Sequence, residues 1–262
     1  MKLMIILLGI LFIFSCDGPI PPVPNNNTGS IHISLGKPTD LDSSDDYIII
    51  RSQYVLSYNH NKNVPNWVAW ELNADWFGDV DRYSGNFITD TSLPAGWYRV
   101  KHSDYTNSGY DRGHMVRSEE RTKTIEDNKS TFILTNILPQ TPDLNRGVWL
   151  QFEYYCEDLC KKENKELFVY AGGIFHTDST IGNGVSVPDS CFKIVVILDR
   201  GQGLNNVNEN TPVYAVVMPN IAGIRTDDWE KYKTTVRRIE SSTGYNFLSA
   251  IKKNIQDVIE NK

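Results

Sequence analysis

Residues 131–162 read TFILTNILPQTPDLNRGVWLQFEYYCEDLCKK, a short apolar run followed by a longer periodic one. The first run, 131–138, is rich in apolar and β-branched residues and stops at Pro139, a pattern typical of a strand. Between 145 and 162 apolar residues recur at spacings of three and four, which predicts a helix. A strand followed by a helix favours a fold that contains both.

Further strands and helices are predicted on both sides of this segment. Aromatic, β-branched and continuous apolar runs are typical of half-buried and buried strands. The expected strands cover 47–58, 66–72, 167–174, 191–198 and 213–218. Amphipathic patterns over 227–240 and 245–259 predict two more helices. Since strands and helices interleave without strict alternation, we predict an α+β fold with a mixed or antiparallel central sheet flanked by helices.

Composition sets broad limits on the chain. It has 262 residues, of which 40% are hydrophobic and 22% charged, ordinary values for a protein that buries a sizeable core. These values exclude a mostly disordered, collagen-like or coiled-coil chain. The formal net charge is −6. Bulk charge therefore does not attract a polyanion, and any binding of nucleic acid must come from a local site.

The N-terminus has the pattern of a targeting segment. Residues 1–15, MKLMIILLGILFIFS, carry one lysine before an apolar run that is too short to span a bilayer, which predicts a signal peptide and export. The run ends at Ser15-Cys16, and a small residue before a cysteine resembles a bacterial lipoprotein box, although Ile13 stands where such boxes usually carry leucine. The resemblance implies a lipid on Cys16 and attachment to the bacterial cell envelope, periplasmic or at the cell surface.

The stretch after the signal is predicted to be a tether. Residues 17–46 are dominated by Pro, Asn, Ser and Asp and show no sustained period of 2 or 3.6. We therefore expect the lipidated Cys16 and a disordered tether to cover 16–46, and one folded domain to cover 47–262.

Three further cysteines, Cys156, Cys160 and Cys191, leave two possibilities open. In an exported protein they can pair, and Cys156 and Cys160 share a helix face where disulfide geometry is awkward. We therefore favour a disulfide between Cys191 and one of the two helix cysteines. A zinc site is the alternative, but no histidine lies close to the pair in the sequence.

One histidine lies in a context with chemical meaning. Residues 110–115 read YDRGHM, which places Arg112 two positions before His114 with Gly113 between them. Arginine stays charged and suits phosphate oxygens, histidine can take a proton from water, and glycine permits close approach. The alternative for these residues alone is a turn with an Asp-Arg ion pair and a structurally satisfied histidine.

A second group of residues follows about thirty positions later. It consists of TNILPQ at 135–140, DLNRGVW at 143–149 and Glu153. Taken in order with DRGH, these motifs resemble the DNA/RNA non-specific endonucleases, whose site is a ββα-metal finger. Weaker resemblance extends over 66–248. The resemblance implies a hydrolase that cleaves phosphodiester bonds of both DNA and RNA.

The resemblance also implies roles for individual residues. His114 matches the general base. Asn145 matches the one protein ligand of a divalent cation, usually Mg²⁺, with Mn²⁺ or another divalent cation as an alternative. Glu153 matches a carboxylate that holds a metal-bound water.

Three further residues match supporting positions. Arg112 matches an arginine that contacts phosphate, and Asn136 matches a polar residue that supports the site. Arg82, in the turn-rich stretch 75–96, aligns loosely with an arginine that stabilises the leaving side, and its alternative is an exposed loop charge.

Because such a site addresses backbone phosphate, we expect little base specificity. The resemblance implies products with a 5′ phosphate and a 3′ hydroxyl. Two alternatives stay open. One is a nuclease for a single polymer or a phosphodiesterase for a smaller substrate. The other is a surface lipoprotein that binds nucleic acid with little or no turnover. Salt-dependent cleavage of both DNA and RNA would discriminate among them.

Overall fold

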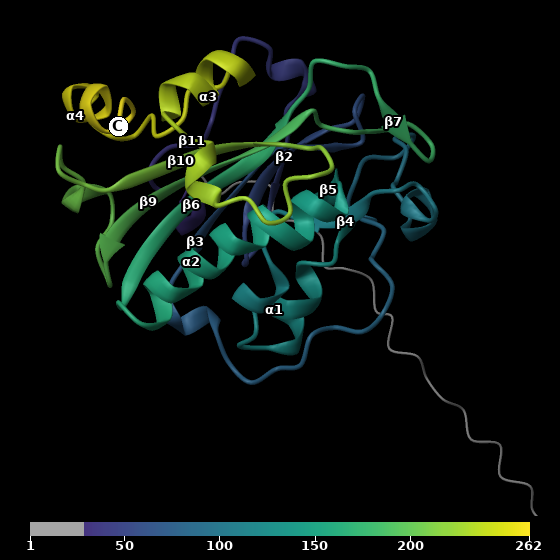
Figure 1. Cartoon of the computed structure of the whole chain (residues 1–262), viewed down its shortest axis with the longest axis horizontal. Helices are drawn as coiled ribbons and strands as arrows, with labels where there is room; N and C mark the ends of the chain where they lie inside the picture. Colours follow the sequence, from purple (N-terminus) through teal and green to yellow (C-terminus); the bar gives the residue numbers. More distant parts are fainter. Residues whose placement is uncertain (1–28) are drawn as a thin grey trace, which may run out of the picture.

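The computed structural model describes residues 29–262 (Figure 1). The predicted signal peptide, Cys16 and the first part of the predicted tether lie outside the described residues. Over residues 29–262, no helix combines the length and the apolar character needed to cross a membrane.

The centre of the fold is a seven-stranded sheet in the order β1-β2-β3-β6-β9-β10-β11. All six neighbouring pairs in it are antiparallel. Its strands are β1 (Tyr47–Ile50), β2 (Val55–Asn59), β3 (Val64–Leu72), β6 (Lys165–Ile174), β9 (Ser190–Asp199), β10 (Val213–Pro219) and β11 (Lys233–Thr234). The predicted α+β fold with an antiparallel central sheet is confirmed.

Helices cover both faces of the sheet. Figure 1 shows α1 (Ile125–Ser130) and α2 (Trp149–Lys161) on one face, and α3 (Val236–Thr243) and α4 (Lys253–Ile259) on the other. Side chains alternate along β9, so successive residues pack into the cores on opposite faces of the sheet. Cys191, Val195 and Ile197 join the core beneath α2, whereas Phe192, Ile194 and Val196 join the core beneath α3 and α4.

Two short ladders stand outside the main sheet. Strands β4 (Asp111–His114) and β5 (Ile137–Gln140) form one antiparallel pair, and β7 (Thr180–Ile181) and β8 (Val185–Ser186) form the other. The remaining elements are short turns of helix: 3₁₀ turns at Ile31–Ile33, Ser43–Asp45, Ala74–Trp76, His102–Tyr105, Ser118–Glu120, Leu134–Asn136, Leu204–Asn206 and Trp229–Tyr232, and a π turn at Leu144–Val148.

The folded unit begins earlier than predicted. His32 is buried, its Nε2 lies 2.9 Å from the carbonyl oxygen of Ser52, and its Nδ1 accepts the backbone N–H of Glu71 at 3.0 Å. Leu35 is fully buried, and Thr39 pairs with Asn246 in an antiparallel bridge. The predicted tether is therefore wrong for residues 30–46, because a few anchoring side chains attach this polar segment to the domain.

Some element boundaries differ from the sequence predictions. The strand expected at 131–138 is displaced to β5, which contains Pro139. A proline is tolerated there because β5 pairs on one side only, with β4. The helices expected at 227–240 and 245–259 shrink to α3 and α4, because turns and the short strand β11 take up the remaining residues.

The predicted disulfide is also wrong. Cys156, Cys160 and Cys191 are free and buried in the core beneath α2. The thiol of Cys160 lies 3.6 Å from the carbonyl oxygen of Leu72, and burial raises the pKa of Cys156 and of Cys191 to about 12. These cysteines act as small apolar residues. The zinc alternative fails too, since residues 29–262 contain no group of three or more His, Cys, Asp or Glu side chains that could hold a metal ion.

Candidate active site

The DRGH segment forms strand β4, which pairs with β5 so that Asp111 faces Gln140 and His114 faces Ile137. The glycine in this strand has a steric reason. A Cβ atom on Gly113 would lie 2.1 Å from Oε1 of Gln140, so the glutamine side chain occupies the space that any other residue would need. The Asn-x-x-Pro-Gln turn and the DRGH segment are thus packed against each other.

A π turn at Leu144–Val148 connects the paired strands β4 and β5, here called the DRGH hairpin, to α2. Gly147 has φ −118° and ψ −111°, outside the helical region, and a Cβ on it would lie 2.6 Å from the backbone of Arg225. π turns inside helices often occur at functional sites. Here the turn places Asn145 and Arg146 beside the hairpin, and β4, β5 and α2 form the predicted ββα motif (Figure 1).

Asp111 joins the hairpin to the helix. Its Oδ2 accepts hydrogen bonds from Asn145 Nδ2 at 3.0 Å and from Arg146 Nε at 2.7 Å. These bonds and the charge of Arg146 lower the pKa of Asp111 despite its partial burial. Because the amide nitrogen of Asn145 is engaged, its carbonyl oxygen is turned away from Asp111.

His114 lies in an aromatic setting. Its ring centroid is 5.2 Å from that of Phe87 and 4.9 Å from that of Phe132, and its Nε2 is buried without a hydrogen-bond partner. Burial, together with the positive charges of Arg82 and Arg117, lowers the pKa of His114 to about 3. The imidazole is therefore neutral at neutral pH, and no protein group among residues 29–262 bonds to its Nε2.

Arg112 is held close to one of these rings, that of Phe87, and to Tyr105. Its Nη2 donates to the carbonyl oxygen of His102 at 2.7 Å, and its guanidinium lies 5.6 Å from the Phe87 ring and 5.5 Å from the Tyr105 ring. Partial burial lowers the pKa of Arg112. Arginine is still fully charged at neutral pH.

Arg82 lies over the second ring beside His114, that of Phe132. Its guanidinium lies 4.8 Å from the Phe132 ring, donates to Glu119 Oε1 at 2.8 Å and contacts Ser118 Oγ. Its charge also acts on the pKa of His114. Arg82 is thus in contact with the group around His114, but it lies in a loop with its side chain 50% exposed, so its role stays a prediction.

Asn136 is bonded to the backbone of neighbouring segments. It is fully buried, its Nδ2 donates to the carbonyl oxygens of Val116 and Thr131 at 3.0 and 2.9 Å, and its Oδ1 accepts the N–H of Val116 at 3.0 Å. Its own carbonyl oxygen accepts the N–H of Met115. Asn136 therefore fixes the backbone that follows His114.

Glu153 lies on α2, two turns beyond Asn145, and is buried. Its Oε1 is 3.3 Å from Nζ of Lys193, and its Oε2 is 3.8 Å from Nε of Arg117. Burial raises the pKa of Glu153, and the charges of Lys193 and Arg117 oppose that rise. Arg117 and Glu119 act on the pKa of both Glu153 and His114, which ties the two side chains to one electrostatic environment.

Two residues of this group were missed from the sequence. Asp111 stands inside the DRGH motif, but nothing in the sequence indicates its bond to Asn145, 34 positions away. Lys193 had a signal, a single charge within the apolar run CFKIVVIL at 191–198.

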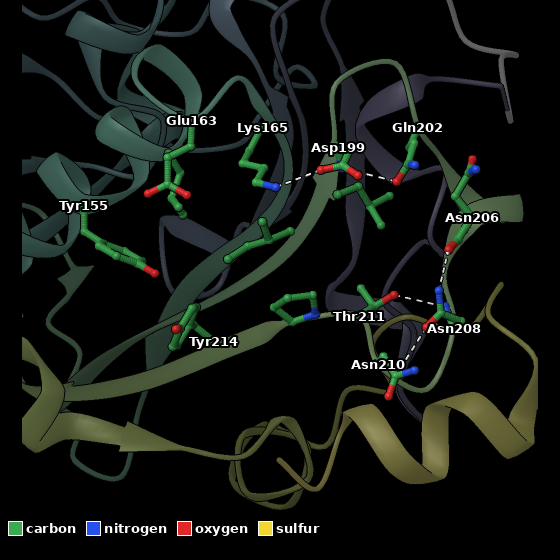
Figure 2. A pocket seen from close by; sticks show the side chains of 14 residues that line it. Tyr155, Glu163, Lys165, Asp199, Gln202, Asn206, Asn208, Asn210, Thr211 and Tyr214 are labelled. Atoms are coloured by element: carbon green, nitrogen blue, oxygen red, sulfur yellow. Dashed lines mark hydrogen bonds and ion pairs between the residues drawn. The ribbon is translucent and has the colours of Figure 1, made fainter.

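A cavity of about 420 Å³ lies at the C-terminal half of α2, away from the DRGH hairpin (Figure 2). None of the predicted site residues lines it. Its polar side chains bond to one another and to nearby backbone: Lys165 of β6 pairs with Asp199 of β9 at 2.7 Å, and Thr211 Oγ1 accepts the N–H of Asn208 at 2.9 Å. The candidate site is therefore the open group around His114 and not this cavity.

The architecture defines an α+β protein whose site is a ββα motif, and comparisons with known proteins agree. The family model described as DNA/RNA non-specific endonuclease matches residues 34–254. A protein named Nuclease from Nostoc sp. is 45% identical over 93% of this chain and 90% of its own length. Nuclease C1 from Cunninghamella echinulata is 30% identical over 77% of this chain and 82% of its own length.

A solved structure agrees as well. The structure of EndoG in complex with EndoGI superposes with a TM-score of 0.72 at 26% identity, covering 85% of this chain and 91% of the other. The human mitochondrial Endonuclease G is 28% identical over 77% of this chain. The chain belongs to the DNA/RNA non-specific endonuclease family. It is accordingly a nuclease, and the family prediction is confirmed.

Proposed function

We propose that this chain is a metal-dependent endonuclease that hydrolyses phosphodiester bonds of both DNA and RNA with little sequence specificity. The observation that carries the proposal is His114, a neutral imidazole whose Nε2 has no protein partner and which lies beside Arg82. A base that accepts a proton from water must be neutral and unoccupied, and a phosphate requires nearby fixed cations.

The donor set fits a divalent cation of the magnesium type. Asn145 commits its amide nitrogen to Asp111, so its carbonyl oxygen is a neutral ligand held in one orientation. Magnesium is often bound through one or two protein oxygens and keeps most of its waters, so a cluster of carboxylates is not required. Asn145 would hold the ion and Glu153 would accept hydrogen bonds from its waters. Mn²⁺ or another divalent cation would fit the same oxygen.

The bound cation would neutralise charge that develops on the leaving oxygen. The protein groups supply the remaining chemistry. His114 takes the proton of the attacking water, Arg112 stabilises charge on the equatorial phosphate oxygens, and Arg82 stabilises the leaving side. Asn136 keeps the backbone beside His114 in place. The products carry a 5′ phosphate and a 3′ hydroxyl, and all contacts address the sugar–phosphate backbone, so sequence selection is weak.

The test is incubation of purified protein with plasmid DNA and with RNA, each with and without EDTA. We expect both polymers to be cleaved, EDTA to stop cleavage, and added Mg²⁺ to restore it. Cleavage of one polymer only would restrict the substrate class. Binding of both polymers without cleavage at any metal concentration would contradict the proposal and favour the nucleic-acid-binding alternative.

We also propose that Cys16 carries a lipid that anchors the protein in the bacterial cell envelope. The support is the apolar run that ends at Ser15-Cys16. Since one acyl chain gives only marginal attachment, stable anchoring requires more than one chain on this cysteine. Native protein should partition into a detergent phase, and Cys16→Ser should not. A mature N-terminus well beyond Cys16 in mass spectrometry would contradict the anchor.

A further inference from the structure

Lys193 is a charged residue in an apolar position. It lies in the middle of β9, on the face whose neighbouring side chains are Cys191 and Val195. Its side chain is 2% exposed. A buried ammonium is costly unless an opposite charge and hydrogen bonds compensate it. The contacts of Lys193 therefore indicate its role.

Among these contacts the ion pair is with Glu153, and the charge of Lys193 also acts on the buried carboxyl of Glu120. Nζ of Lys193 lies 3.3 Å from Oε1 of Glu153, and within residues 29–262 this is the one ion pair that Lys193 makes. The ammonium also lies 4.2 Å from the centroid of the Trp149 ring and 5.6 Å from that of the Trp70 ring. The aromatic faces stabilise the cation and limit where it can go. Lys193 is thus fixed against Glu153.

The second cation near Glu153 is Arg117, which also pairs with other carboxylates. Nε of Arg117 lies 3.8 Å from Oε2 of Glu153, but the same guanidinium lies 3.1 Å from Glu119 and 2.7 Å from Glu157. Arg117 therefore divides its charge among three carboxylates. In the described part of the chain, Oε2 of Glu153 accepts no direct hydrogen bond from protein, which leaves that oxygen for water.

We propose that Lys193 is the positioning residue of Glu153. Its ammonium keeps the buried carboxylate charged and engages Oε1, so that Oε2 accepts hydrogen bonds from the waters of the cation held at Asn145. The inference rests on the proposed function through the role given there to Glu153. Stability alone does not account for this lysine, because replacing a buried ion pair with apolar side chains is often neutral or stabilising.

The experiment compares Lys193→Met, Glu153→Gln and the double variant Lys193→Met/Glu153→Gln with the wild type. Mg²⁺ binding is measured by calorimetry without substrate, and melting temperature is measured separately. We expect Lys193→Met to weaken Mg²⁺ binding about 10–100-fold, the usual range for groups that orient metal ligands or their waters. The double variant should bind Mg²⁺ no more weakly than Glu153→Gln, because the lysine acts through the carboxylate.

The melting temperatures of the variants distinguish a positioning role of Lys193 from a role in packing alone. Lys193→Met alone leaves Glu153 buried without its lysine and should lower the melting temperature. The double variant removes both charges and should recover much of that loss without recovering Mg²⁺ affinity. Lys233→Met is the matched control, because Lys233 also lies over a tryptophan, 4.8 Å from the Trp229 ring, but pairs with Glu230. It should leave Mg²⁺ binding unchanged.

Each contrary outcome has a distinct meaning. Wild-type Mg²⁺ affinity in Lys193→Met, together with weakened binding in Glu153→Gln, would overturn the inference and leave the proposed function intact. Wild-type affinity in both single variants would overturn the inference together with the role of Glu153. Additive losses in the double variant would show that Lys193 does not act through Glu153. If Lys193→Met does not fold, the comparison of the double variant with Glu153→Gln decides.

Discussion

The two faces of the central sheet use buried residues differently, and β9 shows the contrast within a single strand. On one face Lys193 stands among apolar neighbours and pairs with Glu153 on α2. On the other face Phe192, Ile194 and Val196 pack into an apolar core beneath α3 and α4. Strand alternation sends successive residues of one apolar run to these two environments.

The buried residues of the two faces differ in what they require of their neighbours. Buried charges such as Glu153 and Lys193 require exact partners, and breaking a buried pair is strongly destabilising, whereas apolar packing needs only shape and volume. The face that carries the Lys193–Glu153 pair, here called the site face, is the one from which Asn145 and His114 are positioned. Substitutions on the site face should therefore lower catalysis, whereas substitutions on the opposite face should lower stability.

The largest effect should follow removal of His114. His114→Ala should lower turnover by about 10²–10⁴-fold, because a positioned acid–base group contributes that much. The ring packs against Phe87 and Phe132 but accepts no protein hydrogen bond at Nε2, so the fold should survive. Plasmid nicking measured beside circular dichroism checks both expectations. Nicking at the wild-type rate would remove His114 from the mechanism.

The matching change on the opposite face is Phe247→Ala. Phe247 is fully buried and packs against Tyr170 and Phe192 at ring distances of 5.9 and 5.6 Å. Loss of a buried phenylalanine typically costs about 3–5 kcal/mol through lost burial and the cavity left behind. Urea unfolding should show this loss, while turnover per folded molecule at low temperature stays near the wild-type value. A fall in turnover as large as that of His114→Ala would break the comparison.

A smaller effect should distinguish metal binding from base catalysis within the site face. Asn145→Ala should weaken Mg²⁺ binding and activity together, and excess Mg²⁺ should restore little. Glu153→Gln keeps the size of the side chain and should cost about 10–100-fold. His114→Ala should leave Mg²⁺ affinity nearly unchanged, because a base is not a ligand. Calorimetric titration of the three variants decides, and loss of Mg²⁺ binding in His114→Ala alone would make histidine the ligand.

The sequence predicted the site face better than the opposite face. The DRGH, Asn-x-x-Pro-Gln and Asn-x-Gly-x-Trp motifs are local, and pairing of β4 with β5 brings them together as predicted. The tether prediction failed at His32 and Leu35, because their partners lie in distant strands and the surrounding composition is polar. The helices expected after residue 227 failed because amphipathic spacing does not reveal interruption by turns.

The smallest expected effect compares two buried histidines, His114 in the site and His32 in the N-terminal arm. Burial lowers the pKa of His114 to about 3 and that of His32 to about 4, from an ordinary value of 6.5. Below pH 6.5 both histidines are protonated in the unfolded chain but stay neutral in the folded protein. The free energy of unfolding should therefore fall as the pH falls from 6.5 toward the two lowered pKa values. For His32, which is 2% exposed, the loss at pH 5 is about 1–2 kcal/mol.

Replacement should flatten this decline, because an asparagine does not titrate. Urea unfolding at pH 7 and pH 5 should show a smaller difference for His32→Asn than for the wild type, whatever the cost of the substitution at pH 7. Activity per folded molecule should be unaffected by His32→Asn and lost in His114→Asn, since only His114 belongs to the site. A pH difference in stability that is identical in wild type and His32→Asn would show that the arm histidine is protonated in the folded protein.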